Sequence, residues 1–226
     1  MATGKMNSAE KPERKHGVMR EKLLEAGLAL FSEKGFDGVA IKDIEACVGL
    51  TAGSGSFYRH FKSKETLLQA IVDREVERIR SMRGLQHAVG GSLGDRRAEL
   101  LLQYRLTLIG LEQIKSLINL LAREYGRFPE LMQQLHDLLV DESLALSARD
   151  FAEDQRKKAV RGKDPEALAA VVQSAIVGYH LSRTYFNSEP NQVNAERFVQ
   201  TLVDLLLRDP PPGHQQPGGQ QPRRRK

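Results

Sequence analysis

Apolar residues recur at the spacing of a helix along most of this 226-residue chain. Between residues 18 and 34 they fall on one broad face with charged residues opposite, which is typical of an amphipathic helix. Strand signals are nearly absent, because the apolar runs do not alternate with polar residues between tight turns. Similar helical patterns follow at 41–48, 55–61, 64–76, 95–124, 130–157, 165–187 and 192–208. The sequence therefore predicts an all-α fold.

Several helix ends carry residues that start or stop a helix. Gly35 and Gly49 are predicted to end the first two helices, because glycine readily adopts the conformation that follows a last turn. Ser63 is predicted to cap the next long helix, and Pro129 suits a first helical position. The sequence Asp164-Pro165-Glu166 places a cap, a first-turn proline and an acid in order, so a helix is expected to start there.

Glycine-rich and proline-rich stretches separate or follow the helices. Residues 84–94, GLQHAVGGSLG, are predicted to form a connector, and Asn191 is predicted to cap the last helix. Residues 209–226, DPPPGHQQPGGQQPRRRK, lack the apolar residues of a core and are predicted to be disordered. We therefore expect four parts: a flexible arm (1–17), a three-helix unit (18–64), a larger helical body (65–208) and a disordered tail (209–226).

Composition favours a soluble, intracellular protein, with 40% hydrophobic and 28% charged residues. No apolar run approaches the roughly 18 residues of a membrane span, and the first residues lack the apolar stretch of a secretory signal. The lone cysteine, Cys47, excludes an internal disulfide, fits a reducing cytoplasm, and is expected to be a small buried residue rather than a redox sensor. The motifs HExxH and CxxC and the Walker loop are absent, so we expect no enzyme, no metal and no cofactor.

Positive charge is concentrated at the two ends of the chain. The net charge is +5; residues 1–64 carry 11 Lys or Arg against 8 Asp or Glu, and the last four residues, RRRK, are all basic. The part in between is slightly acidic. This asymmetry suggests an anionic partner, with nucleic acid as the default reading. The RRRK tail either adds non-specific affinity through counterion release or only solubilises the end.

Two short helical patterns joined by a glycine turn suggest a helix-turn-helix. In this motif the second helix enters the major groove of DNA while the first crosses the backbone. Residues 49–65 read GLTAGSGSFYRHFKSKE, so small residues run into an aromatic and basic cluster. Phe57 and Phe61 are spaced to anchor the second helix in the core. The side chains that remain available to contact DNA are Tyr58, Arg59 and His60.

The stretch GLALFSEKGFDGVAIKDIEACVGLT…GSFYRHFKSKETLL resembles the DNA-binding domain of the TetR family of bacterial transcription regulators. The matching features are a helix that ends in LFSEKGF, the sequence I-K-D-I, a V-G-L-T turn, a Y-x-H-F recognition helix and S-K-E. The resemblance covers roughly residues 18–72. It implies a cytoplasmic, sequence-specific regulator, nucleoid-associated when DNA-bound, that acts as a repressor and homodimer on a palindromic operator. It also implies release by a small molecule bound to the body; a regulator that acts through a protein partner, without such an effector, stays open.

The same resemblance assigns roles to residues of the helix-turn-helix. Phosphate contacts are expected from Lys42, Thr51, Tyr58, His60 and Lys64. Contacts to base edges are expected from Ser54, Ser56 and Arg59, because arginine pairs readily with guanine. Two departures from the family pattern stand out: two extra residues lie within 52–54, and Ala40 replaces the usual Ser/Thr cap of the helix at 41–48.

The body offers candidates for a pocket and for an interface. Polar-tipped side chains that are candidates to line an effector pocket are Tyr104, Tyr125, His136, Tyr179, His180 and Tyr185. A stripe on the penultimate helix is expected to form a dimer contact with the last helix, and its members are Val172, Ala175, Gly178 and Phe186.

Overall fold

The chain folds into a set of packed helices in the computed structural model, which describes residues 10–91 and 93–208. No strand is found within these residues, which confirms the predicted all-α fold. None of the described helices is long and apolar enough to cross a membrane. The elements are α1 (Glu10–Lys34), α2 (Ile41–Cys47), the 3₁₀ helix η1 (Ser56–Arg59), α3 (Lys64–Gly91), α4 (Arg96–Arg123), α5 (Pro129–His136), the π-helical η2 (Asp137–Glu142), α6 (Ser143–Arg156), α7 (Pro165–Phe186), the 3₁₀ turn η3 (Pro190–Gln192) and α8 (Ala195–Leu206).

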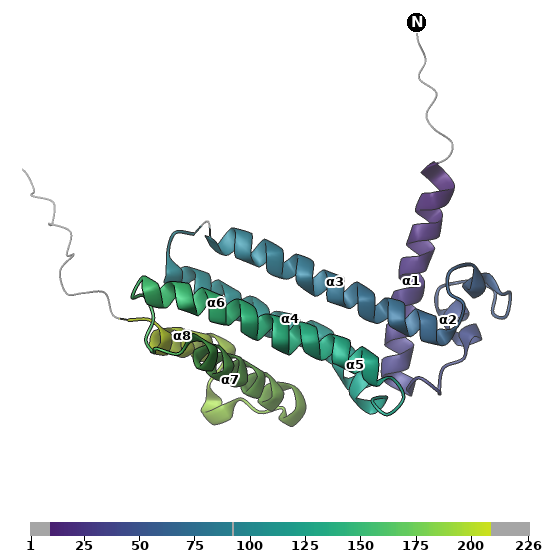
Figure 1. Ribbon diagram of the computed structural model, residues 1–226. Coiled ribbons are helices and arrows are strands. Elements are labelled where there is room, and N and C mark those ends of the chain that lie inside the picture. The colour runs from purple at the N-terminus through teal and green to yellow at the C-terminus, as the bar shows by residue number, and fades with distance from the viewer. Residues whose placement is uncertain (1–9, 92, 209–226) are drawn as a thin grey trace, which may run out of the picture.

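The two ends of the molecule carry different parts of the chain (Figure 1). At one end lie α1, α2 and η1, together with the start of α3. Towards the other end lie α7, which packs on α6, and α8, which packs on α4. Between the ends, α3 and α4 pack against each other and run along the length of the molecule. The helices α3 and α4 therefore connect the two ends of the molecule.

Buried apolar side chains form two cores that meet along α4. The first core joins α1, α2, η1 and the first half of α3 to the C-terminal part of α4 and to α5. The second core joins the N-terminal part of α4 to α6, α7 and α8. On α4, Leu117 and Leu121 belong to the first core, whereas Tyr104 and Leu108 belong to the second. The first core therefore crosses the domain boundary expected after residue 64.

Three of the predicted helix starts are confirmed. At the start of α3, Ser63 Oγ accepts a hydrogen bond from the Thr66 N–H at 3.2 Å. At the start of α7, Asp164 Oδ1 accepts from the Ala167 N–H at 2.9 Å. Pro129 occupies the first turn of α5, where a missing N–H costs nothing. The two side-chain caps satisfy N–H groups that have no partner within their own helix.

The predicted connector at 84–94 is wrong, because α3 continues as a helix through most of it. Each of the three glycines in this part of the helix costs roughly 1 kcal/mol relative to alanine. Contacts with η2 and α6 oppose this cost: Arg83 donates to the Leu138 carbonyl at 2.9 Å and to Ser143 Oγ at 2.5 Å. Tertiary contacts thus prevail over local helix propensity here.

The cap of the last helix is also not the predicted one. Asn191 lies in η3 with a left-handed φ of 51°. The cap of α8 is Asn194, whose Oδ1 accepts a hydrogen bond from the Arg197 N–H at 2.9 Å. The last helix therefore starts later than the sequence pattern predicts.

The N-terminal helix is longer than the sequence predicts. It begins at Glu10, inside the segment 1–17 that is expected to be a flexible arm. Residues 1–9 and the tail 209–226, with its RRRK end, lie outside the described residues.

Candidate nucleic-acid interface

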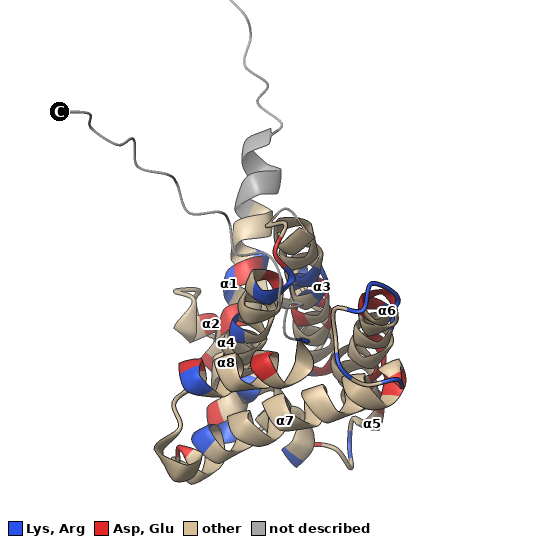
Figure 2. Cartoon of the chain, turned by 90° about the vertical axis from the view of Figure 1, so that its left-hand side faces the viewer, with Lys and Arg blue, Asp and Glu red and all other residues tan. Residues whose placement is uncertain are grey.

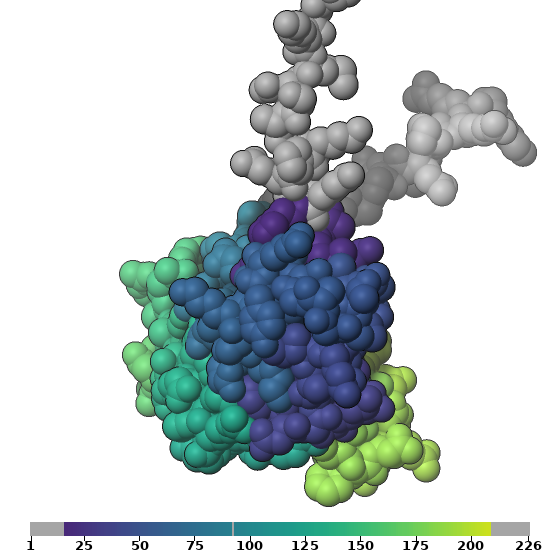
Figure 3. Space-filling view, turned by 90° about the vertical axis from the view of Figure 1, so that its right-hand side faces the viewer, coloured from purple at the N-terminus to yellow at the C-terminus, as the bar shows by residue number. Residues whose placement is uncertain are grey.

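The candidate interface is the surface of α2, η1 and the turn between them, on the side of the molecule that faces the viewer in Figure 3. Phe57 is fully buried and Phe61 is 5% exposed, so both anchor this segment in the first core, as predicted. Tyr58 is 59% exposed, and Arg59 is exposed as well. The segment therefore presents an aromatic and a basic side chain outward while its phenylalanines hold it in place.

The second helix of the motif is shorter than predicted. The expected helix over 55–61 is a 3₁₀ helix of four residues, after which the N–H groups of His60 and Phe61 both donate to the Phe57 carbonyl, at 2.9 and 3.0 Å. Gly55, directly before it, has a left-handed φ of 73°, which is incompatible with a helix that starts earlier. The Ser54 hydroxyl also accepts a hydrogen bond from the Ser56 N–H at 3.3 Å, an arrangement that competes with a helical turn.

A buried carboxylate, which the sequence analysis did not single out, holds the turn before η1. Glu45 on α2 is 1% exposed. Its Oε2 accepts a hydrogen bond from the Gly53 N–H at 2.7 Å, and its Oε1 accepts from the Phe57 N–H at 3.0 Å. The sequence carries no local signal for this role, because the two N–H groups that Glu45 binds lie 8 and 12 residues further along the chain. This carboxylate joins α2 to the middle of the enlarged turn and to η1.

Most of the expected DNA-contacting side chains are accessible. Lys42, Thr51 and Ser54 are exposed, and Ser56 is half-buried. Together with Tyr58 and Arg59 they belong to α2, the turn and η1, which are neighbours in the fold. Cys47 is exposed rather than buried, because Ile44 takes the buried position on α2.

The start of α2 lacks a side-chain cap, as Ala40 leads one to expect. Asp43 supplies half of the usual arrangement, because its Oδ2 accepts a hydrogen bond from the Ala40 N–H at 2.9 Å.

Lys64 points into the protein rather than away from it. Its ammonium donates to the Phe36 carbonyl at 2.8 Å and to the Val39 carbonyl at 2.7 Å. It also lies 4.6 Å from the centre of the Phe36 ring, in cation–π contact. Two of its three donors thus hold the loop between α1 and α2, so Lys64 differs from the other expected phosphate contacts.

His60 is half-buried against the side of α1. Its ring lies 4.2 Å from the ring of His16, centre to centre, and His16 Nε2 lies 3.4 Å from the Arg59 carbonyl oxygen. Among the described residues, no hydrogen-bond partner is found for the buried His60 Nδ1. Burial lowers the pKa of His60 below its ordinary value of 6.5, and the positive charges of His16, Arg20 and Arg59 lower it further.

The loop between α1 and α2 is also fixed to the body. The Phe36 N–H donates to Glu124 Oε1 at 3.1 Å, and Arg123 donates to the Phe31 carbonyl at 2.8 Å. The Arg127 guanidinium lies 4.6 Å from the centre of the Phe36 ring and pairs with the carboxylate of Asp37. The C-terminal end of α4 and the residues after it are thus tied to the helix-turn-helix by hydrogen bonds as well as by the first core.

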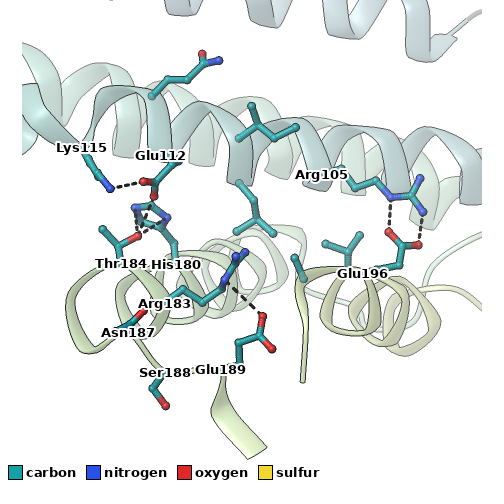
Figure 4. A pocket seen from close by; sticks show the side chains of 15 residues that line it. Arg105, Glu112, Lys115, His180, Arg183, Thr184, Asn187, Ser188, Glu189 and Glu196 are labelled. Carbon is teal, nitrogen blue, oxygen red and sulfur yellow. Dashed lines mark hydrogen bonds and ion pairs between the residues drawn. The ribbon is translucent and has the colours of Figure 1, made fainter. Parts of the chain in front are cut away.

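The body holds an open cavity of about 1090 Å³ between α4, α7 and the segment that leads into α8 (Figure 4). Of the six polar-tipped candidates, only His180 lines it. Tyr179 is turned away: it stacks on Phe198 at 4.2 Å and donates its hydroxyl to the Val193 carbonyl at 2.9 Å. Tyr104 is buried beside a much smaller cavity, whereas the remaining candidates, Tyr125, His136 and Tyr185, are exposed outside the large one.

The charged groups that line this cavity face one another in pairs (Figure 4). Arg105 donates to Glu196 at 2.8 Å, and Arg183 lies 3.9 Å from Glu189. Glu112 pairs with Lys115 and accepts a hydrogen bond from the Thr184 hydroxyl at 3.1 Å. Burial lowers the pKa of His180, which keeps its ring neutral near pH 7. Between the pairs, the wall is formed by the apolar side chains Leu108, Ile109, Ala195 and Val199.

An apolar stripe runs along the outer face of α7. No charged residue lies between Glu166 and Arg183, and the ribbon of α7 is mostly tan in Figure 2. Of the four residues expected at an interface, Gly178 and Phe186 are exposed, Ala175 is half-buried and Val172 is 4% exposed in the second core. The large exposed apolar side chains of α7 and α8 are Val171, Leu181, Tyr185, Phe186 and Leu205.

Comparisons with known proteins centre on the helix-turn-helix. Residues 23–71 match the family model described as "Bacterial regulatory proteins, tetR family". The chain is 41% identical over 59 residues to the HTH-type transcriptional regulator UidR of Escherichia coli (strain K12), covering 26% of this chain and 29% of that protein. It is 45% identical over 47 residues to the HTH-type transcriptional repressor DhaR of Mycobacterium sp. (strain GP1), covering 21% and 23%. The chain thus spans less than a third of the length of these curated relatives.

A solved structure extends the likeness beyond this segment. A TetR transcriptional regulator from Chloroflexus aurantiacus J-10-FL aligns with a TM-score of 0.65 at 23% identity, covering 86% of this chain and all of that chain (100%). At this identity the likeness concerns the fold.

The fold and the exposed face of η1 define a helix-turn-helix domain joined to an all-helical body. The segment at 23–71 matches the TetR family model and is similar to curated regulators, which confirms the resemblance that the sequence motifs indicate.

The lowered pKa of His60 predicts that the protein loses stability in mild acid. Below pH 6.5 the unfolded chain binds a proton at this histidine more readily than the folded chain does, so the free energy of unfolding falls as the pH drops. His60→Gln is expected to reduce the loss between pH 7.5 and 5.5, as measured by urea denaturation. His87→Gln, at an exposed position on α3, is the control and should behave like the wild type. An unchanged pH profile in His60→Gln would contradict the assignment.

Proposed function

We propose that this chain is a transcription regulator that binds duplex DNA through α2, the turn and η1. The observation that carries the proposal is the outward position of Tyr58 and Arg59 on a segment anchored by two buried phenylalanines. Its support from outside the chain is the identity of this segment to curated regulators. Those relatives are named as regulators, which agrees with the expectation that this chain is not an enzyme.

Within this proposal the residues divide by role. Arg59 reads base edges, assisted by Ser54 and Ser56 at the end of the turn. Positioning contacts to phosphates come from Lys42, Thr51, Tyr58 and His60. Lys64 acts differently, because its ammonium already holds the loop between α1 and α2; it supports the interface from within unless DNA binding frees it.

We also propose that two copies of the chain pair through α7 and α8. The exposed stripe at 171, 178, 181 and 185 repeats at helical spacing and is free of charge, which suits an isologous contact between two identical faces. Val172 supports this face from the core instead of forming it. A two-fold dimer presents two η1 elements, so the operator should be palindromic.

A small molecule bound in the cavity of the body is proposed to control DNA binding. The cavity is large enough for a drug-sized ligand, and its lining combines apolar side chains with charged and polar ones that can orient a ligand. One of its walls is α4, whose other end is bonded to α1 through Arg123 and, through the following Glu124, to Phe36 in the loop after α1. A ligand that shifts α4 would therefore change the position of the helix-turn-helix. Action as a repressor agrees with the name of the relative DhaR.

Localisation follows from this function: the protein is proposed to act in the bacterial cytoplasm, associated with the nucleoid while bound to DNA. The alternative mechanism is control by a protein partner without a small-molecule effector. A search for ligands of the body distinguishes the two mechanisms.

The DNA-binding role is tested with Arg59→Ala. Wild-type protein should enrich one sequence from a pool of random duplexes, and fluorescence anisotropy then gives affinities for the enriched and a scrambled duplex. Arg59→Ala is expected to weaken binding to the enriched duplex by about 1–3 kcal/mol and to the scrambled duplex much less. The matched control, Lys62→Ala, removes a charge from the same surface and should weaken both similarly. If Arg59→Ala changes neither affinity, the assigned role of η1 is wrong.

The dimer is tested with Leu181→Glu. A buried, unpaired carboxylate at the centre of the proposed contact should convert the dimer to a monomer, measured by size-exclusion chromatography with light scattering at micromolar concentration. Leu85→Glu, on the exposed face of α3, is the control and should leave the mass unchanged. A dimer that persists in Leu181→Glu places the contact elsewhere.

The effector site is tested with Ile109→Trp, which fills the cavity from the α4 side. Compounds from a metabolite library that raise the melting temperature of the wild type are expected to bind the variant at least about tenfold more weakly. Leu85→Trp is the control and should bind them normally. A library without ligands for the wild type, or ligands that bind Ile109→Trp equally well, would favour the protein-partner alternative.

A further inference from the structure

We propose that Glu45 is a positioning residue for DNA recognition, whose carboxylate sets the place of η1 relative to α2. This inference rests on the proposed DNA-binding function. Glu45 touches no DNA in the proposal; it acts through the backbone of the turn and of η1.

The Glu45 carboxylate binds two backbone N–H groups, one in the turn and one in η1. Oε2 accepts from the N–H of Gly53, in the middle of the turn, at 2.7 Å. Oε1 accepts from the N–H of Phe57, inside η1, at 3.0 Å. Because each oxygen has its own donor, the two bonds together fix both the position and the orientation of the segment at 53–57.

Backbone amides are the partners that allow this charge to be buried. Glu45 is 1% exposed, and no ion pair to it is found among the described residues. A buried carboxylate without partners is strongly disfavoured, so the native arrangement depends on the two N–H groups staying in place. The dependence is mutual, since both N–H groups lose a charged acceptor if the carboxylate is removed.

The enlarged turn has few other restraints. Residues 51–54 are all exposed. A side-chain atom added at Gly53 or at Gly55 would meet nothing within 4 Å, so packing does not fix their positions. Other local bonds lie within the segment: the Ser54 N–H donates to the Thr51 carbonyl at 3.0 Å, the Ser56 N–H to the Ser54 hydroxyl at 3.3 Å, and the two hydroxyls of Ser54 and Ser56 lie 2.9 Å apart. None of these bonds ties the turn to α2 as the carboxylate does.

Through these bonds Glu45, on the first helix of the motif, affects which bases the second helix contacts. The residue after Phe57 is Tyr58, and Arg59 follows, so a shift of the Phe57 backbone moves both outward side chains. Ordering the turn before DNA arrives removes part of the entropic cost of binding. Loss of the bridge should therefore reduce specific binding, which needs register, more than non-specific binding, which needs only charge.

The test uses the full chain and the duplex that the wild type enriches from a random pool, beside a scrambled duplex. Glu45→Gln keeps the size but offers one acceptor in place of two, and its amide nitrogen opposes the second N–H. It is expected to lower affinity for the enriched duplex about tenfold or more, while affinity for the scrambled duplex stays equal or rises because a negative charge is lost. Glu45→Asp keeps the charge but is one methylene shorter, and should show the same loss of specificity.

Glu25→Gln, at an exposed position on α1, is the matched control for the change of charge. It should leave the ratio of the two affinities unchanged. If Glu45→Gln lowers both affinities by the same factor, or if Glu45→Asp behaves like the wild type, the bridge does not position η1 and the proposal is overturned.

A second measurement needs neither a variant nor DNA. In hydrogen–deuterium exchange of the wild type followed by NMR, the exposed Gly53 amide should exchange slowly, because it donates to the buried Glu45 carboxylate together with the Phe57 amide. The amide of Gly38, outside this network, should exchange faster. A Gly53 amide that exchanges as fast as that of Gly38 would overturn the bridge. A wild type that enriches no sequence would instead refute the proposed DNA-binding function, and the NMR result would still decide the bridge.

Discussion

The structure depends on α4, which is shared by two hydrophobic cores. Its C-terminal half is packed among the helices of the helix-turn-helix, and its N-terminal half among those of the body. Neither core is complete without it. Close-packed interiors have low compressibility and transmit strain. A shift of α4 in one core should therefore also move the side chains that pack on it in the other core. The hydrogen bonds from the Phe36 N–H to Glu124 and from Arg123 to the Phe31 carbonyl of α1 strengthen this coupling beside the proposed DNA-binding surface.

Sequence patterns predicted the parts of this fold that local forces decide. Helical periodicity, the caps at Ser63 and Asp164 and the buried pair Phe57 and Phe61 all depend on neighbours within a few residues. The prediction of a connector at 84–94 failed because the helix there is supported by α6, for example through the hydrogen bond from Arg83 to Ser143, which lies 60 residues away in the sequence. Such distant contacts have no local signature.

The same division holds for the candidate sites. The outward position of Arg59 follows from its place between the two anchors. The inward turn of Lys64 does not, because its partners are backbone carbonyls of another loop that carry no mark in the sequence. The cavity was missed for a related reason: tyrosines suggested a pocket, whereas the walls are built from charged side chains whose pairing appears only when α4 and α7 meet.

The open space around Gly53 and Gly55 has a consequence for which substitutions this turn can accept. Room for a larger side chain exists at both positions, yet both backbones have left-handed torsion angles. The restriction on replacement is therefore one of chirality rather than of volume. Asparagine would be tolerated there and valine would not, although both fit. A relative with a turn of this length should preserve handedness at these two positions while the identities of the residues around them drift.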